Sequence, residues 1–264
     1  MRQSNPDFIE ALARGLEVIR VFGTFKGQLS LSEIATATNL ARPTVRRILI
    51  TLESLGYATS ANGAFSLTPR VLDLGTAHVA SSNIWDLTRP HLIKLVGELD
   101  ESSSIAQLDG GDIVYVSRVA VPKLITLTVS IGTRFPAYAT SLGKVLLSGL
   151  SDDEALVIRH KTSTSMISPS WQPSDEEFLT AIRQVRAKGW AMTDQQLAPA
   201  IRSVAAPIRN GNGEIVAAIN VNTHAMETNE SRLTEVILPR LLQAAREISA
   251  DWASWESRAE IDLT

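Results

Sequence analysis

Apolar residues near the start of the chain recur at intervals of three and four positions. They are Phe8, Leu12, Leu16, Ile19 and Phe22, with mainly polar or small residues between them. This is the period of an amphipathic α-helix, in which side chains three and four apart share a face. The pattern predicts a first helix from Phe8 to Phe22.

Two further helices are marked by signals at their ends. Ser30 and Glu33 have the Ser-x-x-Glu spacing of a capping box, in which the two side chains satisfy free amides at the start of a helix. Asn39 predicts the end of that helix, because asparagine tolerates a left-handed conformation. Pro43 falls in the first turn of a third helix, where proline is favourable, and Gly56 predicts its end.

The second and third helices together match a helix-turn-helix pattern counted from Leu31. The required small, turn and apolar residues are Ile34, Ala35, Asn39, Leu40, Val45 and Ile48, and the polar residue Thr38 is the one departure. On the third helix, a predicted inward stripe consists of Val45, Ile48, Leu49, Leu52 and Leu55. The other face carries Thr44, Arg46 and Arg47, with Arg42 just before it, as a recognition helix would.

A hairpin follows the third helix. Tyr57–Ala61 and Ala64–Leu67 read as strands joined by Asn62-Gly63, a dipeptide typical of tight hairpin turns. Three helices and a hairpin predict a winged helix-turn-helix, with candidate DNA-binding residues Arg42, Pro43, Thr44, Arg46, Arg47 and Asn62. An arginine here could bond a guanine or a phosphate. The alternatives are a solvated helix face and a module that binds a partner protein.

The rest of the chain predicts an α+β domain behind a linker. Residues 1–69 form the predicted DNA-binding domain, 70–84 a linker helix, and 85–264 a larger α+β domain. Expected strands are 104–108, 113–119, 124–129, 201–209 and 214–221; expected helices are 85–99, 142–150, a segment after the Ser174 capping box, and 231–252. Pro239 should kink or split the last helix, since it cannot donate a backbone hydrogen bond.

Composition and charge add limits to this picture. The 264 residues contain no cysteine, which excludes disulfides and thiolate chemistry and fits a reducing compartment. Residues 1–70 hold eight Lys/Arg against five Asp/Glu, and the remainder seventeen against twenty-three, so the net charge of −3 divides into about +3 and −6. No signal peptide or membrane span is apparent, and we expect a cytoplasmic protein.

Catalytic motifs are absent from the sequence. The four histidines have no metal-ligand spacing, Gly143-Lys144 lacks the rest of a phosphate loop, and Ser141 lacks the first glycine of a nucleophile elbow. We therefore expect no metal, no cofactor and no enzyme activity, although turnover of a small acid is an alternative. An irregular segment, residues 132–144, runs into a helix, whose N-terminal amides attract carboxylates. Arg134 and Tyr138 would suit an aromatic or keto acid there, and an ordinary capped loop is the alternative.

These features resemble the IclR family of bacterial regulators over almost the whole chain. The resemblance rests on residues 44–49, on the 132–144 segment, on Gly189-Trp190 leading to Asp194, and on residues 201–207 before a second hairpin. Residues 129–141 are similar to the subgroup that controls protocatechuate, 4-hydroxybenzoate and β-ketoadipate catabolism. The resemblance implies a GAF-like effector domain, a homodimer or dimer of dimers, and binding to inverted-repeat operator DNA.

The resemblance also implies where an effector would bind. The carboxylate would meet the segment at Thr140 and the backbone amides of Ser141 and Leu142, and side chains from later strands would be Thr193 or Asp194, Ser203, Asn220 and Asn222. The chain departs from the family at Gln195 and Gln196, where acidic residues are usual, and at Ala200, where glycine is usual. These departures affect the expected charge and shape of the site.

Overall fold

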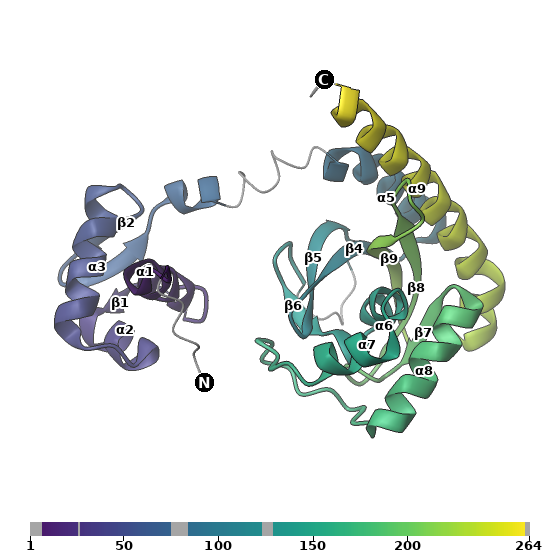
Figure 1. Ribbon diagram of the computed structural model, residues 1–264, viewed down its shortest axis with the longest axis horizontal. Coiled ribbons are helices and arrows are strands. Elements are labelled where there is room, and N and C mark those ends of the chain that lie inside the picture. The colour runs from purple at the N-terminus through teal and green to yellow at the C-terminus, as the bar shows by residue number, and fades with distance from the viewer. Residues whose placement is uncertain (1–6, 26, 75–83, 123–128, 262–264) are drawn as a thin grey trace. The chain divides into compact units, whose positions relative to one another are not determined.

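The computed structural model describes residues 7–25, 27–74, 84–122 and 129–261 (Figure 1). The chain divides into two compact units, Met1–Ser82 and Asn83–Thr264. Each unit has its own hydrophobic core, and each is described by itself. The two-domain α+β class predicted from the sequence is confirmed.

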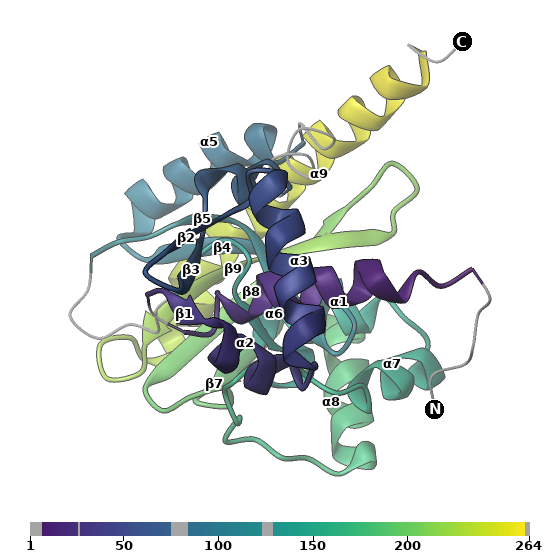
Figure 2. The ribbon, with the colours of Figure 1, turned by 90° about the vertical axis from the view of Figure 1, so that its left-hand side faces the viewer.

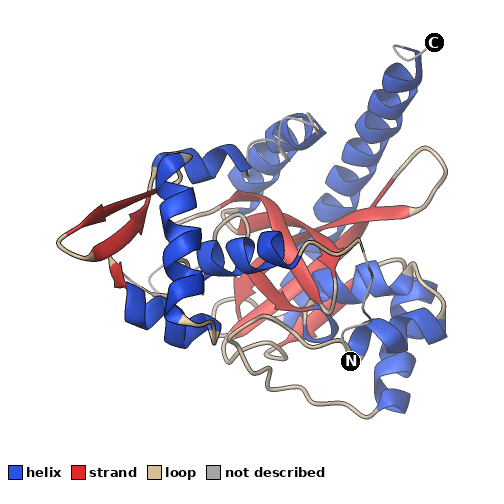
Figure 3. Cartoon of the chain, turned by 60° about the vertical axis from the view of Figure 1, so that its left-hand side comes forward, coloured by secondary structure: helices blue, strands red, loops and turns tan. Residues whose placement is uncertain are grey.

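The N-terminal unit is a winged helix-turn-helix. Its elements are α1 (Glu10–Val21), β1 (Leu29–Ser30), α2 (Leu31–Thr38), α3 (Arg42–Ser54), β2 (Ala58–Ala61) and β3 (Ala64–Leu67). The strands pair antiparallel in the order β1-β3-β2, and the β2–β3 hairpin extends away from the helices (Figure 3). Strand β1 was not predicted, because two residues carry no recognisable period.

Local signals in the sequence explain the ends of these elements. Ser30 and Glu33 form the predicted capping box, and Asn39 ends α2 with a φ of 52°. Pro43 lies in the first turn of α3. Asn62 and Gly63 have φ values of 54° and 80°, the two positive values that a tight hairpin turn requires.

The core of the N-terminal unit differs from the apolar stripes that the sequence predicts for α1 and α3. Its centre is formed by Val18, Ile34, Val45 and Leu49, and Thr38 is buried there because its hydroxyl donates to the Ile34 carbonyl at 2.7 Å. Leu55, predicted to point inward, is 53% exposed because α3 has ended before it. Three residues of the predicted α1 stripe are also exposed, namely Phe8, Leu12 and Leu16.

The C-terminal unit contains one six-stranded antiparallel sheet among the residues described, in the order β6-β5-β4-β9-β8-β7. The strands are β4 (Ser102–Asp109), β5 (Asp112–Val119), β6 (Arg134–Pro136), β7 (Ala191–Asp194), β8 (Ile201–Arg209) and β9 (Ile215–His224). The helices are α5 (Ile84–Leu99), α6 (Ser141–Ser148), α7 (Asp152–Arg159), α8 (Asp175–Lys188) and α9 (Leu238–Ile261). Two shorter helical turns of this unit are η2 (Ala137–Ala139) and η3 (Arg232–Ile237); a third, η1 (Pro69–Val71), belongs to the N-terminal unit.

Helices cover both faces of this sheet (Figure 1). Alternate residues of β8 show the division: Val204 and Ala206 pack in the core with α5 and α9, whereas Ala205 packs in the core with α6 and α8. Ser203 therefore points to the α6 side, because side chains alternate along a strand. This alternation decides which predicted site residues can meet.

Several predicted elements need correction or lie outside the described residues. Strands β6 and β7 and helix α7 were missed. The last helix was predicted to kink or split at Pro239; the structure has the π-helical turn η3 run directly into α9 at Leu238, so the helix changes type there without a break. Most of the 124–129 strand and residues 75–83 of the linker helix fall outside the described part; the linker begins with η1.

Candidate functional site

The outward face of α3 presents arginines that are free of protein partners. Arg42, Arg46 and Arg47 are exposed, and within the described residues none of the three guanidinium groups has an ion pair. Pro43 is exposed beside them, and Thr44 is half-buried. Asn62 is exposed at the tip of the hairpin. The predicted DNA-binding residues therefore lie on solvent-facing parts of one unit, on α3 and on the hairpin tip.

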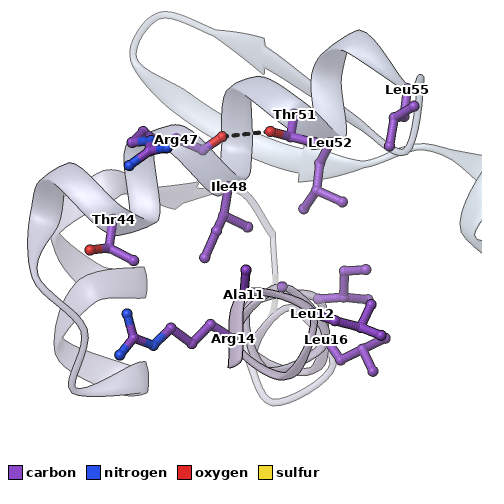
Figure 4. Close-up of a pocket in the computed structure, with 12 residues that line it drawn as sticks. Ala11, Leu12, Arg14, Leu16, Thr44, Arg47, Ile48, Thr51, Leu52 and Leu55 are labelled. Carbon is purple, nitrogen blue, oxygen red and sulfur yellow. Dashed lines mark hydrogen bonds between the residues drawn. The ribbon is translucent and has the colours of Figure 1, made fainter. Parts of the chain in front are cut away.

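Helices α1 and α3 cross each other (Figure 2), and a groove bordered by Thr44 and Arg47 lies between them (Figure 4). Leu12 and Leu16 from α1 and Ile48, Leu52 and Leu55 from α3 line it, and its volume is about 510 Å³. Leu12 and Leu16 are 61% and 46% exposed. The groove is thus a mainly apolar surface that no described residue of this unit covers.

A polar cluster lies on the α6 side of the C-terminal sheet, buried under the start of α6. Ser141 and Ser203 have their hydroxyl oxygens 2.7 Å apart, and Ser203 donates to the Val221 carbonyl, so Ser141 is the donor between them. Asn220 Nδ2 donates to Ser203 Oγ at 3.3 Å and to Asn222 Oδ1 at 3.0 Å. The structure therefore brings together residues from α6, β8 and β9 that the sequence places up to 81 positions apart.

The start of α6 leaves hydrogen-bond donors open. Thr140 caps the helix by accepting from the Gly143 amide at 2.9 Å. The amides of Ser141 and Leu142 have no acceptor among the described residues, as expected for the first turn of a helix. Asn220 Oδ1 is a buried acceptor that likewise lacks a partner within the described chain. Two open donors and one open acceptor thus belong to one connected cluster.

Tyr115 and Arg118 belong to the same side of the sheet and were missed by the sequence analysis. Burial raises the pKa of Tyr115 to about 12, against the opposing effects of Arg118 and of its hydrogen bond with Asn222. Arg118 donates to Ser104 Oγ at 2.9 Å, and burial lowers the pKa of its guanidinium. The signal that could have found them was a charged residue, Arg118, inside a mainly apolar predicted strand.

Lys144 is a buried cation one turn further along α6. It is 3% exposed, it donates to Gln196 Oε1, and its Nζ lies 3.9 Å from the centre of the Trp171 ring. No carboxylate of the described residues pairs with it. Burial lowers the pKa of Lys144 to about 8. The Gln196 that departs from the family pattern is therefore the hydrogen-bond partner of a buried lysine.

Three predicted effector residues lie outside the cluster. Arg134 Nη2 lies 2.6 Å from Asp109 Oδ2, and its Nε lies 3.5 Å from Asp112 Oδ2, so its positive charge is already paired with carboxylates of the protein. Tyr138 donates to Gln172 at 3.3 Å. Arg134 lies on β6, the edge strand of the sheet, which pairs with β5, and Tyr138 lies in η2 just after that strand.

Asp194 also lies apart, on the opposite face of the sheet from Ser203. It pairs in register with Arg202 and forms an ion pair with it at 2.7 Å, which holds the pKa of Asp194 below its usual value. Thr193 is buried and pairs in register with Ser203, on the α6 side. Of the two alternatives in the sequence, the structure places Thr193 beside the cluster.

Among the described residues, no group of three His, Asp or Glu side chains gathers as a metal site would require. In the same part of the chain, no helix is long and apolar enough to cross a bilayer.

Comparison with known families identifies both units. The model for the IclR helix-turn-helix domain matches residues 11–61, and the model for the bacterial transcriptional regulator IclR C-terminal domain matches residues 76–250. The chain is 39% identical over 251 residues to the Pca regulon regulatory protein of Pseudomonas putida, covering 92% of this chain and 84% of that protein. It is 30% identical to the p-hydroxybenzoate hydroxylase transcriptional activator of Acinetobacter baylyi, covering 92% and 91%.

Solved structures agree with these matches. A transcriptional regulator from Rhodococcus sp. RHA1 superposes with a TM-score of 0.81 at 43% identity, covering 94% of this chain and 99% of that one. An IclR homologue from Microbacterium hydrocarbonoxydans, solved in complex with 4-hydroxybenzoate, superposes with a TM-score of 0.76 at 19% identity, covering 92% and 99%. The latter likeness is one of fold.

Proposed function

The chain belongs to the IclR family of bacterial transcriptional regulators, and from that membership we propose that it senses a small aromatic or keto carboxylic acid and controls a catabolic operon. Helix α3 would enter the major groove of an inverted-repeat operator, with Arg42, Pro43, Thr44, Arg46 and Arg47 facing DNA and Asn62 on the wing. The unpaired arginines support this, because guanidinium groups without protein partners are available to phosphates and guanines.

The effector proposal rests on one observation, the open hydrogen-bonding groups at the start of α6. The Ser141 and Leu142 amides can donate to a carboxylate, which the helix dipole also favours. Asn220 Oδ1 can accept from a hydroxyl group on the same ligand. A hydroxylated aromatic acid has both groups. Thr193, Ser203 and Asn222 would orient it, and Lys144 adds positive charge nearby.

The ligand must act by favouring one arrangement of the DNA-binding units. An effector changes DNA affinity only if it binds two states of the protein unequally. A second copy of the chain would supply the second half-site, and the uncovered groove between α1 and α3 supports a contact between copies. Sedimentation of the purified protein with and without operator DNA measures this assembly.

The test is a DNA-binding titration with the full chain. DNA from its upstream intergenic region is titrated at several salt concentrations, with and without protocatechuate, 4-hydroxybenzoate and β-ketoadipate. We expect salt-sensitive, specific binding that one acid alters. Arg46→Ala should weaken binding about tenfold or more and reduce the salt slope if it contacts a phosphate.

Matched serine variants test the effector site. Ser203→Ala removes the acceptor of the Ser141 and Asn220 hydrogen bonds and should weaken effector binding about 5- to 10-fold. Ser148→Ala is the control, because this serine is also buried, lies at the far end of α6 and donates its hydroxyl to the Val145 carbonyl of its own helix. If the DNA affinity is the same at every concentration of all three acids, the proposed effector class is wrong, while the proposed DNA-binding function remains.

A further inference from the structure

An isoleucine lies among the arginines of the recognition helix. Ile50 follows Arg46 by four residues and Arg42 by eight, so the three side chains form one stripe along α3. Ile50 is 50% exposed, although Leu49 and Leu52 beside it are buried. It borders a hollow of about 500 Å³ that is also lined by Leu31, Arg42, Pro43, Arg46 and Arg47.

This isoleucine belongs neither to the core nor to the groove between α1 and α3. The residues that line that groove do not include Ile50, and Arg47 is the one residue that borders both hollows. Its position is therefore on the surface that faces DNA in the proposed complex. An exposed isoleucine there cannot bond a phosphate or the polar edge of a base.

One apolar group is available to it in the major groove. The C5-methyl of thymine projects into that groove, and the other base edges present donors and acceptors. Four residues of helix rise about 6 Å, which corresponds to roughly two base-pair steps of about 3.4 Å along the groove. A side chain one helical turn after Arg46 can thus reach a base pair close to the one that Arg46 contacts.

We propose that Ile50 recognises a thymine in each operator half-site by packing against its C5-methyl group. The inference rests on the proposed function, because it requires α3 to enter the major groove. The arginines hold the helix on the DNA, and Ile50 makes binding depend on one A·T pair that charge alone would not select. Removing a single buried methyl contact should weaken binding about fourfold.

The experiment removes the methyl group from the DNA and the side chain from the protein. A specific site is selected in vitro with the full chain, and each thymine in it is replaced in turn by deoxyuridine, which lacks only the C5-methyl. We expect one thymine per half-site at which deoxyuridine weakens wild-type binding about fourfold. Ile50→Ala should bind the two DNAs equally at that position.

A second variant in the same unit controls for the loss of exposed apolar surface. Leu74→Ala removes a side chain that is 49% exposed and that lines neither hollow, and it should keep the wild-type ratio between thymine and deoxyuridine. If no thymine responds, or if Ile50→Ala keeps the wild-type ratio, the inference is overturned while the regulator stands. If wild-type protein selects no DNA, both proposals are overturned.

Discussion

The two candidate binding regions of this chain are built in opposite ways. On α3, charged side chains are exposed and have no partners in the described protein, so their binding capacity is unused until DNA arrives. At the start of α6, polar side chains are buried and bonded to one another, and few groups remain open. An exposed surface suits a large polyanion, whereas a buried network suits a small ligand whose groups must match those few positions.

The same difference predicts where substitutions are costly. An exposed arginine can be replaced with little effect on folding, because few contacts depend on it. A residue that positions α6 cannot be replaced without a loss of stability, because every residue of that helix is buried.

Gly143→Ala should unfold the C-terminal unit. A Cβ at this position would overlap the backbone of Ala137, which cannot move as a flexible side chain could. We expect a loss of about 4 kcal/mol or more in the free energy of unfolding. All five tryptophans lie in this unit, so tryptophan fluorescence during urea unfolding measures it selectively.

A glycine on α5 provides the matched control. Gly97 has no atom within 4 Å of an added Cβ, and it lies inside a helix. Gly97→Ala should therefore stabilise the unit by up to about 1 kcal/mol, because alanine favours the helix. Equal unfolding midpoints for the two variants would show that α6 is not rigidly packed on η2.

The DNA-binding region could be predicted from the sequence, whereas most of the buried cluster could not. The α2–α3 turn and the hairpin depend on neighbours in the chain, such as Ser30 with Glu33 and Asn62 with Gly63, and they were predicted. The buried cluster depends on strand pairing between distant segments. Tyr115 and Arg118 approach Asn222 and Ser104 only through the β5-β4-β9 order, which periodicity does not specify.

The Arg134, Tyr138 and Asp194 predictions show what sequence spacing omits. All three lie close in sequence to residues of the expected site, but Arg134 and Tyr138 lie on and just after the edge strand β6, and Asp194 lies on the other side of its strand from the cluster. Asp194 and Thr193 are neighbours in sequence and point to opposite faces of the sheet. Strand β7 itself was not predicted, so its alternation was not available.

Lys144→Met should change how stability depends on pH. The pKa of Lys144 falls from 10.5 to about 8 in the folded chain, so between these values the unfolded chain binds more protons and the free energy of unfolding rises with pH. This contribution amounts to roughly 2–4 kcal/mol across that window. The free energy of unfolding of the wild type should therefore rise by that amount, relative to that of Lys144→Met, between pH 7 and pH 10.5.

Lys94→Met is the control for this measurement. Its side chain is 58% exposed, and removing an exposed lysine should leave the pH slope as in the wild type. The comparison uses urea unfolding at both pH values, so that other titrating groups cancel between variants. A wild type whose slope equals that of Lys144→Met would mean that the ammonium is not desolvated in the folded chain.

Arg134→Gln should produce the smallest effect and separates Arg134 from the buried cluster. Asp112 is 1% exposed; burial acts to raise the pKa of its carboxyl, and bonds from Ser163 and Thr164 together with the Arg134 charge hold that pKa below its usual value. Removing the Arg134 charge should cost about 1 kcal/mol at pH 7. The cost should shrink as the pH falls through the Asp112 pKa, because protonated Asp112 no longer attracts a cation.

Effector affinity is the decisive measurement for this variant. Arg134 is bound to Asp109 and near Asp112, so its replacement should change the affinity for a carboxylic acid less than twofold, whereas Ser203→Ala should change it about 5- to 10-fold. Calorimetric titration of both variants with 4-hydroxybenzoate, or with whichever acid alters operator binding, gives the two values. A larger loss for Arg134→Gln would mean that the carboxylate binds at the edge strand β6, and the open amides of α6 would then need another ligand.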